Sequence, residues 1–134
     1  MKKSLLALAI AALASSAQGQ NIADGRAHFD RYCATCHGGD ARGDGPMAPI
    51  LLLQPSDLTQ IKNRAKGAFP TLRVIAKIDG RDAFLAHGSS MPVYGEFFEG
   101  RGVTIRGEEG ILIMTSQPIV DLIAYLQSIQ AAPQ

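Results

Sequence analysis

Residues 33–37 read Cys-Ala-Thr-Cys-His, and this spacing of two thiols and an imidazole is the part of the chain whose chemistry is clearest. In a Cys-x-x-Cys-His segment, the two thiols can form thioethers with the vinyl groups of one haem, and the adjacent histidine can bind the iron. We therefore expect Cys33 and Cys36 to hold one haem c covalently and His37 to be an iron ligand. The segment therefore predicts a redox function.

Two other interpretations of the same segment remain as alternatives. A thiol-disulfide redox motif shares the Cys-x-x-Cys spacing, but it is expected after a strand within a βαβ pattern, which the neighbouring sequence does not show. A structural zinc ion needs four ligands, and the chain has no cysteine besides Cys33 and Cys36. Haem attachment is therefore favoured over both.

Residues 1–19 have the pattern of a secretory signal peptide, with two lysines, an apolar run at residues 5–14 and then a zone of small residues. Cleavage is expected after Ala17 or Gly19. The apolar run is short for a bilayer, so we expect a periplasmic protein with no membrane span in its mature form. Covalent haem attachment in bacteria also takes place outside the cytoplasm, so the two signals agree.

We expect residues 20–134 to form a single domain, and their charge limits the classes of partner. The sequence has 13 basic and 12 acidic side chains, and loss of the two N-terminal lysines leaves 11 basic ones. This near-neutral balance gives no support for nucleic-acid binding or for attraction to a membrane surface. A core of this size is small, and a buried porphyrin would enlarge it.

Basic residues nevertheless gather between residues 62 and 81, where the only acidic residues nearby are Asp79 and Asp82. The cluster consists of Lys62, Arg64, Lys66, Arg73, Lys77 and Arg81. Such a cluster could dock acidic redox partners, although a solvated surface has the same composition. One of its three arginines could instead pair with a haem propionate.

Helices are predicted to position the motif. The expected helices cover residues 22–36, capped by Asp24; 56–66, capped by Ser56 and ended by Gly67; 70–80, followed by a turn over 81–87; and 116–129, capped by Ser116. Residues 103–105 and 111–113 are compatible with short strands. The last helix has a continuous apolar stripe, and Gly25 offers a notch on the first helix where Leu122 or Tyr125 could approach closely.

The segment from Gly38 to Pro55 is rich in glycine and proline and is predicted to be a loop. It contains four consecutive apolar residues, 50–53. These residues could cover a face of the haem or belong to the ordinary core, and the sequence does not separate the two.

A second axial ligand is expected downstream of His37, and the candidates are Met47, His87, Met91 and Met114. Met91 is favoured because it lies in an irregular stretch more than fifty residues from His37, enough chain to wrap around a porphyrin. His87 remains the alternative, since an iron with two histidine ligands is chemically sound. The other two methionines are expected to be core residues.

Three segments in this order resemble the class I c-type cytochromes, which are monohaem, periplasmic proteins with His/Met ligation. They are the helix with Gly25 and Phe29 leading into the Cys-x-x-Cys-His motif, the stretch 87–95 with its Met-Pro-x-aromatic-Gly pattern, and residues 121–126. The resemblance implies an all-α fold of the class I cytochrome c type. In that fold the N- and C-terminal helices pack together around one covalently bound haem.

The resemblance also implies roles for single residues. Cys33 and Cys36 would form the thioethers, His37 would be the proximal ligand and Met91 the distal ligand. A proline carbonyl would hold the ring N–H of His37, with Pro49 preferred to Pro46 because of its distance from the histidine. Tyr94 stands where many relatives carry tryptophan, and it would hydrogen-bond a haem propionate.

The predicted function is one-electron transfer between periplasmic redox partners, by a monomer or a subunit of a redox complex. We expect no enzyme and no catalytic residues, because six ligands leave no open coordination position and no acid–base constellation surrounds the motif. The alternatives are a haem-based gas sensor and a haem subunit of a larger dehydrogenase or reductase.

Overall fold

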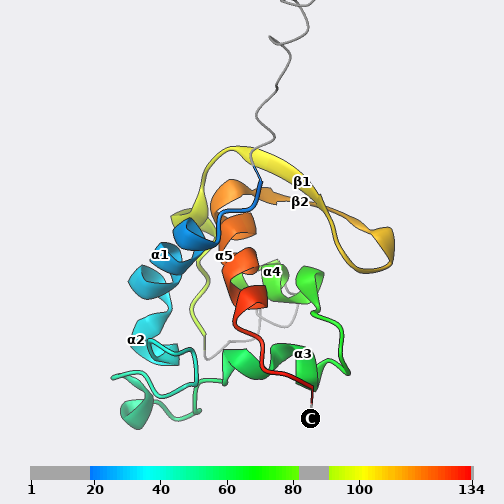
Figure 1. Cartoon of the computed structure of the whole chain (residues 1–134). Coiled ribbons are helices and arrows are strands. Elements are labelled where there is room, and N and C mark those ends of the chain that lie inside the picture. The colour runs from blue at the N-terminus through cyan, green and yellow to red at the C-terminus, as the bar shows by residue number, and fades with distance from the viewer. Residues whose placement is uncertain (1–18, 82–90, 134) are drawn as a thin grey trace, which may run out of the picture.

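Five helices and one hairpin make up the computed structural model, which describes residues 19–81 and 91–133 (Figure 1). The helices are α1 (Ile22–Tyr32), α2 (Ala34–His37), α3 (Ile61–Arg64), α4 (Thr71–Asp79) and α5 (Gln117–Ser128), and the strands are β1 (Gly102–Arg106) and β2 (Leu112–Ser116). Single 3-10 turns lie between them: η2 (Ala48–Ile50), η3 (Leu58–Gln60), η5 (Gly95–Phe98) and η6 (Glu108–Gly110). Residues 1–18 of the predicted signal peptide and most of the turn predicted over residues 81–87 lie outside the described residues.

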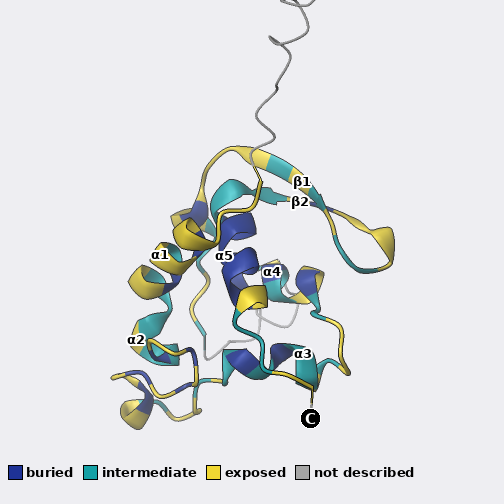
Figure 2. Cartoon of the chain, in the orientation of Figure 1, coloured by how far each residue is buried: buried dark blue, intermediate teal, exposed yellow. Residues whose placement is uncertain are grey.

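Helix α5 is the centre of the fold, with every residue from Ile119 to Leu126 buried (Figure 2). A helix that is apolar on all sides is expected at the middle of a core rather than at its edge. Its one buried charge, Asp121, is hydrogen-bonded: Oδ1 accepts from the backbone N–H of Asn21 at 2.8 Å and from Gln117 Nε2 at 2.9 Å. These bonds offset the cost of burying a carboxylate.

Helix α1 packs across α5 where Gly25 removes a side chain from the interface. A Cβ at Gly25 would collide with the carbonyl oxygen of Asp121 and lie 2.9 Å from the Cβ of Tyr125. One turn later the Phe29 ring packs on Tyr125, with ring centroids 5.3 Å apart. The predicted contact of the two terminal helices is therefore confirmed, and so is the role of Gly25 as a notch.

The caps of α1 and α5 differ from the prediction. Asn21, not Asp24, caps α1: its Oδ1 accepts from the N–H groups of Ala23 and Asp24 at 3.0 and 3.3 Å. Helix α5 begins after Ser116 as expected, but the Ser116 hydroxyl donates to the carbonyl of Phe98 at 2.5 Å and leaves the helix uncapped. In both cases a polar side chain has a different hydrogen-bond partner from the one that was predicted.

Between the terminal helices, the segment predicted as one helix over residues 56–66 is shorter in the structure. It consists of η3 and α3, and the cap is Asp57, which accepts from the N–H of Thr59 at 2.9 Å. Helix α4 agrees with the prediction. It ends at Gly80, whose left-handed conformation (φ 85°) stops the helix.

An antiparallel hairpin of β1 and β2 corrects the all-α prediction. Its register pairs Ile105 with Ile113, and Ile113 is only 2% exposed, so one face of the hairpin is anchored in the core. Leu112 and Met114 point the other way and are exposed. Partly buried and exposed residues alternate along β1, and three consecutive residues of it are β-branched, which favours a strand.

Among the described residues, no helix is long and apolar enough to cross a bilayer.

The close approach at Gly25 predicts that Gly25→Ala destabilises the protein by about 3 kcal/mol, because the backbone of α5 must move to admit a methyl group. Urea unfolding followed by circular dichroism measures this change. Gly102→Ala is the matched control, since a Cβ there meets nothing within 4 Å. Equal unfolding midpoints for the two variants would contradict the packing of α1 on α5.

Candidate functional site

The Cys-x-x-Cys-His segment is positioned by the end of α1 and by the single turn of α2. The N–H of Cys33 donates to the carbonyl of Phe29 at 2.8 Å, and the N–H of His37 donates to the carbonyl of Cys33 at 2.9 Å. Helical backbone therefore continues through the motif. Since residues four apart share a helix face, Cys33 and His37 project to the same side.

A glycine-rich loop closes against the back of the motif. The N–H groups of Gly45 and Met47 donate to the carbonyls of Cys36 and Thr35, at 3.1 and 3.0 Å. At Gly45 a Cβ would lie 2.5 Å from the Thr35 oxygen, so only glycine lets the two backbones approach this closely. The loop thereby fixes α2 from outside and leaves its other face open to the interior.

The ring of His37 is held by a backbone carbonyl, but the carbonyl belongs to Ser56. Its Nδ1 lies 2.9 Å from the Ser56 oxygen. In the structure Ser56 therefore takes the place predicted for Pro49, with Pro46 as its alternative, and both prolines are exposed. No side-chain signal could have identified Ser56, because every residue carries the same carbonyl group.

This contact decides which nitrogen of His37 can bind a metal. A carbonyl oxygen only accepts, so Nδ1 carries the hydrogen and Nε2 keeps a free lone pair. Burial lowers the pKa of His37, and the Ser56 bond opposes this in part. The ring is therefore neutral near pH 7, which is the state that ligates a metal.

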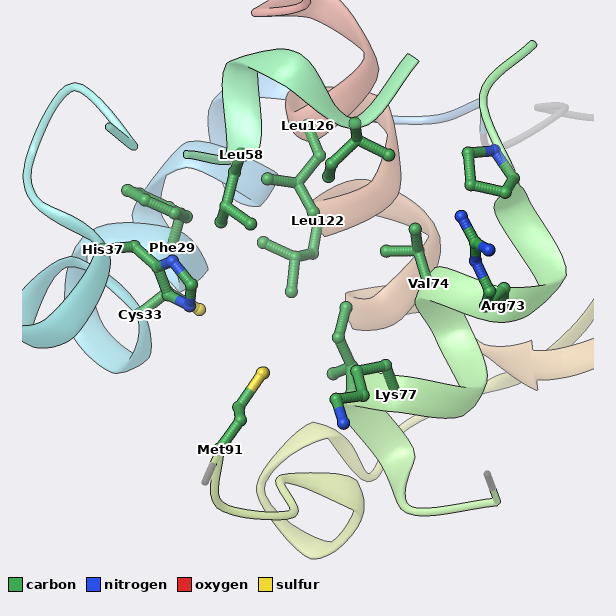
Figure 3. A pocket seen from close by; sticks show the side chains of 13 residues that line it. Phe29, Cys33, His37, Leu58, Arg73, Val74, Lys77, Met91, Leu122 and Leu126 are labelled. Atoms are coloured by element: carbon green, nitrogen blue, oxygen red, sulfur yellow. The ribbon is translucent and has the colours of Figure 1, made fainter. Parts of the chain in front are cut away.

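Beside His37 lies a cavity of about 360 Å³ whose wall is mainly apolar (Figure 3). The wall is formed by Phe29, Cys33, His37, Leu58, Ile61, Pro70, Arg73, Val74, Lys77, Ile78, Met91, Leu122 and Leu126. A second cavity of about 190 Å³ adjoins Cys36, Leu51, Leu53, Pro92 and Tyr94. Because Cys33, His37, Lys77 and Met91 line both, the two cavities form one site around the motif.

Met91 is the predicted ligand that the fold brings to this site. Its side chain reaches into the main cavity, into which the His37 ring also projects from another segment (Figure 3). Met47 and Met114 are 38% and 74% exposed and line neither cavity, so the prediction that they are core residues is wrong. His87 lies outside the described residues.

The two cysteines form no disulfide with each other, and the environment of Cys33 disfavours thiol-disulfide exchange. Burial, followed by the effect of neighbouring Cys36, raises the pKa of Cys33 to about 12. Exchange requires a thiolate, which such a thiol does not supply near neutral pH. Among the described residues, no group of three His, Cys, Asp or Glu side chains could hold a metal ion on its own.

Tyr94 lines the second cavity, and its backbone N–H donates to the carbonyl of Ile78 at 2.8 Å. Burial raises the pKa of Tyr94, and the nearby Cys33 and Cys36 raise it further. Its hydroxyl therefore keeps its hydrogen near neutral pH and can donate to an anionic group.

The structure distinguishes among the three arginines that were candidates for a propionate. Arg73 lines the main cavity together with Lys77, one turn further along α4 (Figure 3). Arg64 lines neither cavity, and Arg81 pairs with Asp79 instead. Two cations on one helix face thus border an otherwise apolar site.

The apolar residues 50–53 divide between two environments. Leu51 and Leu53 line the second cavity, whereas Ile50 and Leu52 do not, and of the four only Leu51 is partly buried rather than exposed. None of the four is in the buried core, so the interpretation as ordinary core is wrong.

The donors and the cavity fit a haem. One neutral imidazole with a free Nε2 and one thioether share an apolar cavity, two thiols stand at its edge, and two cations border it. Iron with an imidazole and a soft thioether ligand is suited to one-electron redox chemistry.

Comparison with known proteins agrees with this chemistry. The cytochrome c family model matches residues 22–130, a segment that contains α1, the Cys-x-x-Cys-His motif, Met91 and α5. No curated protein and no solved structure was found to match. Members of the family bind haem c and are generally electron carriers. The match spans well over half of the sequence, and the chain therefore belongs to the cytochrome c family, as its resemblance to the class I c-type cytochromes predicted.

Proposed function

We propose that the protein is a periplasmic one-electron carrier. In this proposal Cys33 and Cys36 hold one haem c through thioethers, and His37 and Met91 bind the iron. The observation that carries it is the Nδ1 contact of His37 with Ser56, which frees Nε2 beside a cavity that Met91 also enters. When bound, the haem supplies a one-electron couple between ferrous and ferric iron.

The residues of the chain tune that couple through solvation and ligand softness. Leu58, Leu122 and Leu126 surround the site with apolar surface and keep water away, which disfavours the extra positive charge of the oxidised state. The Met91 sulfur is soft and prefers the reduced state. The Ser56 carbonyl orients the His37 ring and keeps it in one tautomer, so the imidazole need not move when the charge changes.

The polar groups at the border of the site suit the propionates of a haem. Arg73 and Lys77 project from one face of α4, and Tyr94 is a protonated donor on the opposite segment. A guanidinium or ammonium paired with a carboxylate forms a charge-assisted hydrogen bond. In the proposal these three side chains hold the propionates and anchor the haem at its polar edge.

The predicted signal peptide and the cluster of basic residues support the proposed location and partners. Domains of this family are usually periplasmic or extracellular, which supports export through the predicted signal at residues 1–19. In the basic cluster, Arg64 and Lys66 are exposed and line neither cavity, and they would dock an acidic redox partner. Arg81 contributes less to this surface, because its guanidinium is committed to Asp79 and to the carbonyl of Met114.

Covalent attachment predicts that intact protein matured in a host with the haem-attachment machinery has the mass of the polypeptide plus one haem. Cys33→Ala with Cys36→Ala should lose the haem after denaturation in acidic solvent, because no thioether remains. Mass spectrometry of both proteins decides the matter. A wild-type mass of the polypeptide alone would contradict the whole proposal.

If Met91 binds the iron, Met91→Ala should lose the charge-transfer band between the methionine sulfur and ferric iron. The variant should also bind carbon monoxide in the ferrous state and have a lower reduction potential. Each tenfold loss of preference for the ferrous state corresponds to about 59 mV. Visible spectra and a redox titration measure these changes. Met114→Ala is the control, since Met114 is exposed on the hairpin. Rapid carbon monoxide binding by the wild type would favour a gas sensor instead.

If Arg64 and Lys66 form a docking surface for anionic partners, Arg64→Glu with Lys66→Glu should slow oxidation of the ferrous protein by the anion hexacyanoferrate(III). A roughly tenfold decrease is expected at low salt, because the cluster steers anions, and the difference should vanish at high salt. Stopped-flow absorbance measures the rates. Arg106→Glu changes charge on the hairpin, away from α3, and serves as the control (Figure 1). Equal rates for both charge changes would contradict the assignment of this surface.

A further inference from the structure

The β1–β2 hairpin contacts both ends of α4, the helix that carries Arg73, Val74, Lys77 and Ile78 into the wall of the main cavity. The two contacts come from different parts of the hairpin. One is made by its tip and the other by the backbone of β2.

At the N-terminus of α4, the carboxylate of Glu108 in η6 accepts hydrogen bonds from the N–H of Thr71 and, at 3.5 Å, from the N–H of Leu72. The preceding residue, Pro70, offers no side-chain cap, and the first turn of α4 contains no acidic residue. The first N–H groups of a helix lack partners within the helix and favour a negative charge. Glu108 thus caps a helix that begins 37 residues before it.

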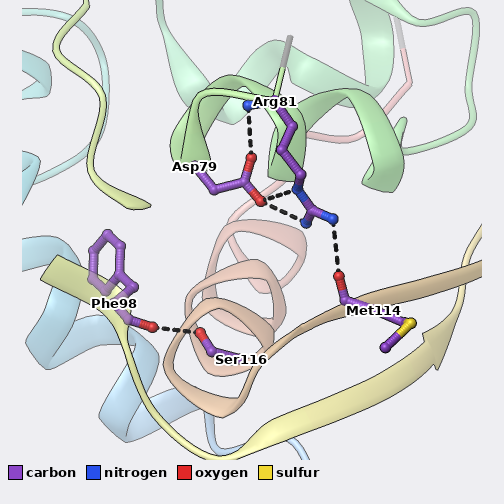
Figure 4. A network of polar contacts seen from close by, with 5 residues as sticks. All are labelled: Asp79, Arg81, Phe98, Met114 and Ser116. Atoms are coloured by element: carbon purple, nitrogen blue, oxygen red, sulfur yellow. Dashed lines mark hydrogen bonds and ion pairs between the residues drawn. The ribbon is translucent and has the colours of Figure 1, made fainter. Parts of the chain in front are cut away.

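At the C-terminus of α4, Arg81 links the helix to β2 (Figure 4). Its Nε donates to the largely buried carboxylate of Asp79 at 2.6 Å, and its guanidinium also donates to the carbonyl of Met114 at 3.0 Å. The cation therefore satisfies Asp79 and the backbone of the hairpin at once.

The hairpin itself is anchored, so that it can hold α4 in place. Ile113 is buried in the core, and the N–H of Gly107 donates to the carbonyl of Ile111 at 2.8 Å, which closes the tip. At the base, the Ser116 hydroxyl bonds to the carbonyl of Phe98 (Figure 4). Anchors at both ends of the hairpin leave Glu108 and the carbonyl of Met114 in defined positions.

We propose that the hairpin is a clamp on α4 and that Glu108 is a positioning residue for the haem site, a role that rests on the proposed function. By holding the first turn of α4, Glu108 keeps Val74 and Ile78 against the cavity and excludes water from it. Solvent exposure of the site lowers the reduction potential. Loss of the Glu108 carboxylate therefore lowers the potential of the haem, because α4 no longer covers the cavity in the same position.

The test compares the holoproteins of Glu108→Ala, Glu108→Gln and Glu109→Gln. The Glu109 side chain is exposed and has no hydrogen bond or ion pair to another side chain in the described part of the chain, so Glu109→Gln is the matched control. Two measurements are made on each protein: amide hydrogen exchange at Thr71 and Leu72, and the reduction potential.

For Glu108→Ala we expect roughly tenfold faster exchange at Thr71 and Leu72, because a charge-assisted bond is lost, together with a lower reduction potential. Glu108→Gln should restore much of both, since its amide oxygen still accepts. Glu109→Gln should match the wild type. An unchanged potential, or exchange that accelerates equally in α1 and α5, would overturn the clamp.

The two measurements also separate this inference from the proposed function. A wild-type protein without a haem spectrum would defeat the electron-carrier proposal. Local acceleration of exchange at Thr71 in Glu108→Ala would still decide whether the hairpin holds α4. Conversely, a normal haem spectrum with no local acceleration would defeat the clamp alone.

Discussion

The approach of α1 to α5 at Gly25 is the constraint on which the rest of the structure depends. Each helix supplies part of the cavity wall: Phe29 comes from α1, with Cys33 directly after its end, and Leu122 and Leu126 come from α5. A larger residue at position 25 would push the two helices apart and displace the motif from the apolar surface opposite it. The position of the redox site is thus set by an interface that contains none of its ligands.

Given that interface, the chemistry depends on backbone groups as much as on side chains. The carbonyl of Ser56 selects the tautomer of His37, and the carbonyls of Thr35 and Cys36 bind the returning loop. Backbone contacts of this kind hold their partners with little freedom, because the groups that make them lie in folded chain rather than on flexible side chains. A ligand that does not move on oxidation needs such support.

The sequence predicted well the features that depend on side-chain type and on spacing along a short segment. The motif at residues 33–37, the helices α1, α4 and α5 and the notch at Gly25 all follow from such patterns. Where the prediction failed, the interacting groups are distant or chemically uniform. The hydroxyl of Ser116 chose the carbonyl of Phe98 over its own helix, and α4 is capped by Glu108, 37 residues away.

The same distinction applies inside the site. Pro49 was expected to hold His37 because proline marks that position in a resembling family, but the group required is a carbonyl, which Ser56 supplies equally well. The hairpin was foreseen only as two segments compatible with strands, since β-branched residues at 103–105 and 111–113 do not reveal their pairing. Ligation by Met91 stays a prediction, supported by its place in the cavity.

The bond between the N–H of Asn21 and Asp121 joins residues 100 positions apart, and this separation has a consequence for biogenesis. At about 5 to 20 residues per second, a ribosome needs roughly 5 to 20 s to add the intervening chain. During that interval α1 has no α5 to pack against, and the thiols of Cys33 and Cys36 lie in an unfinished, open polypeptide. The site can therefore close between the two terminal helices only after the C-terminal helix has been synthesised.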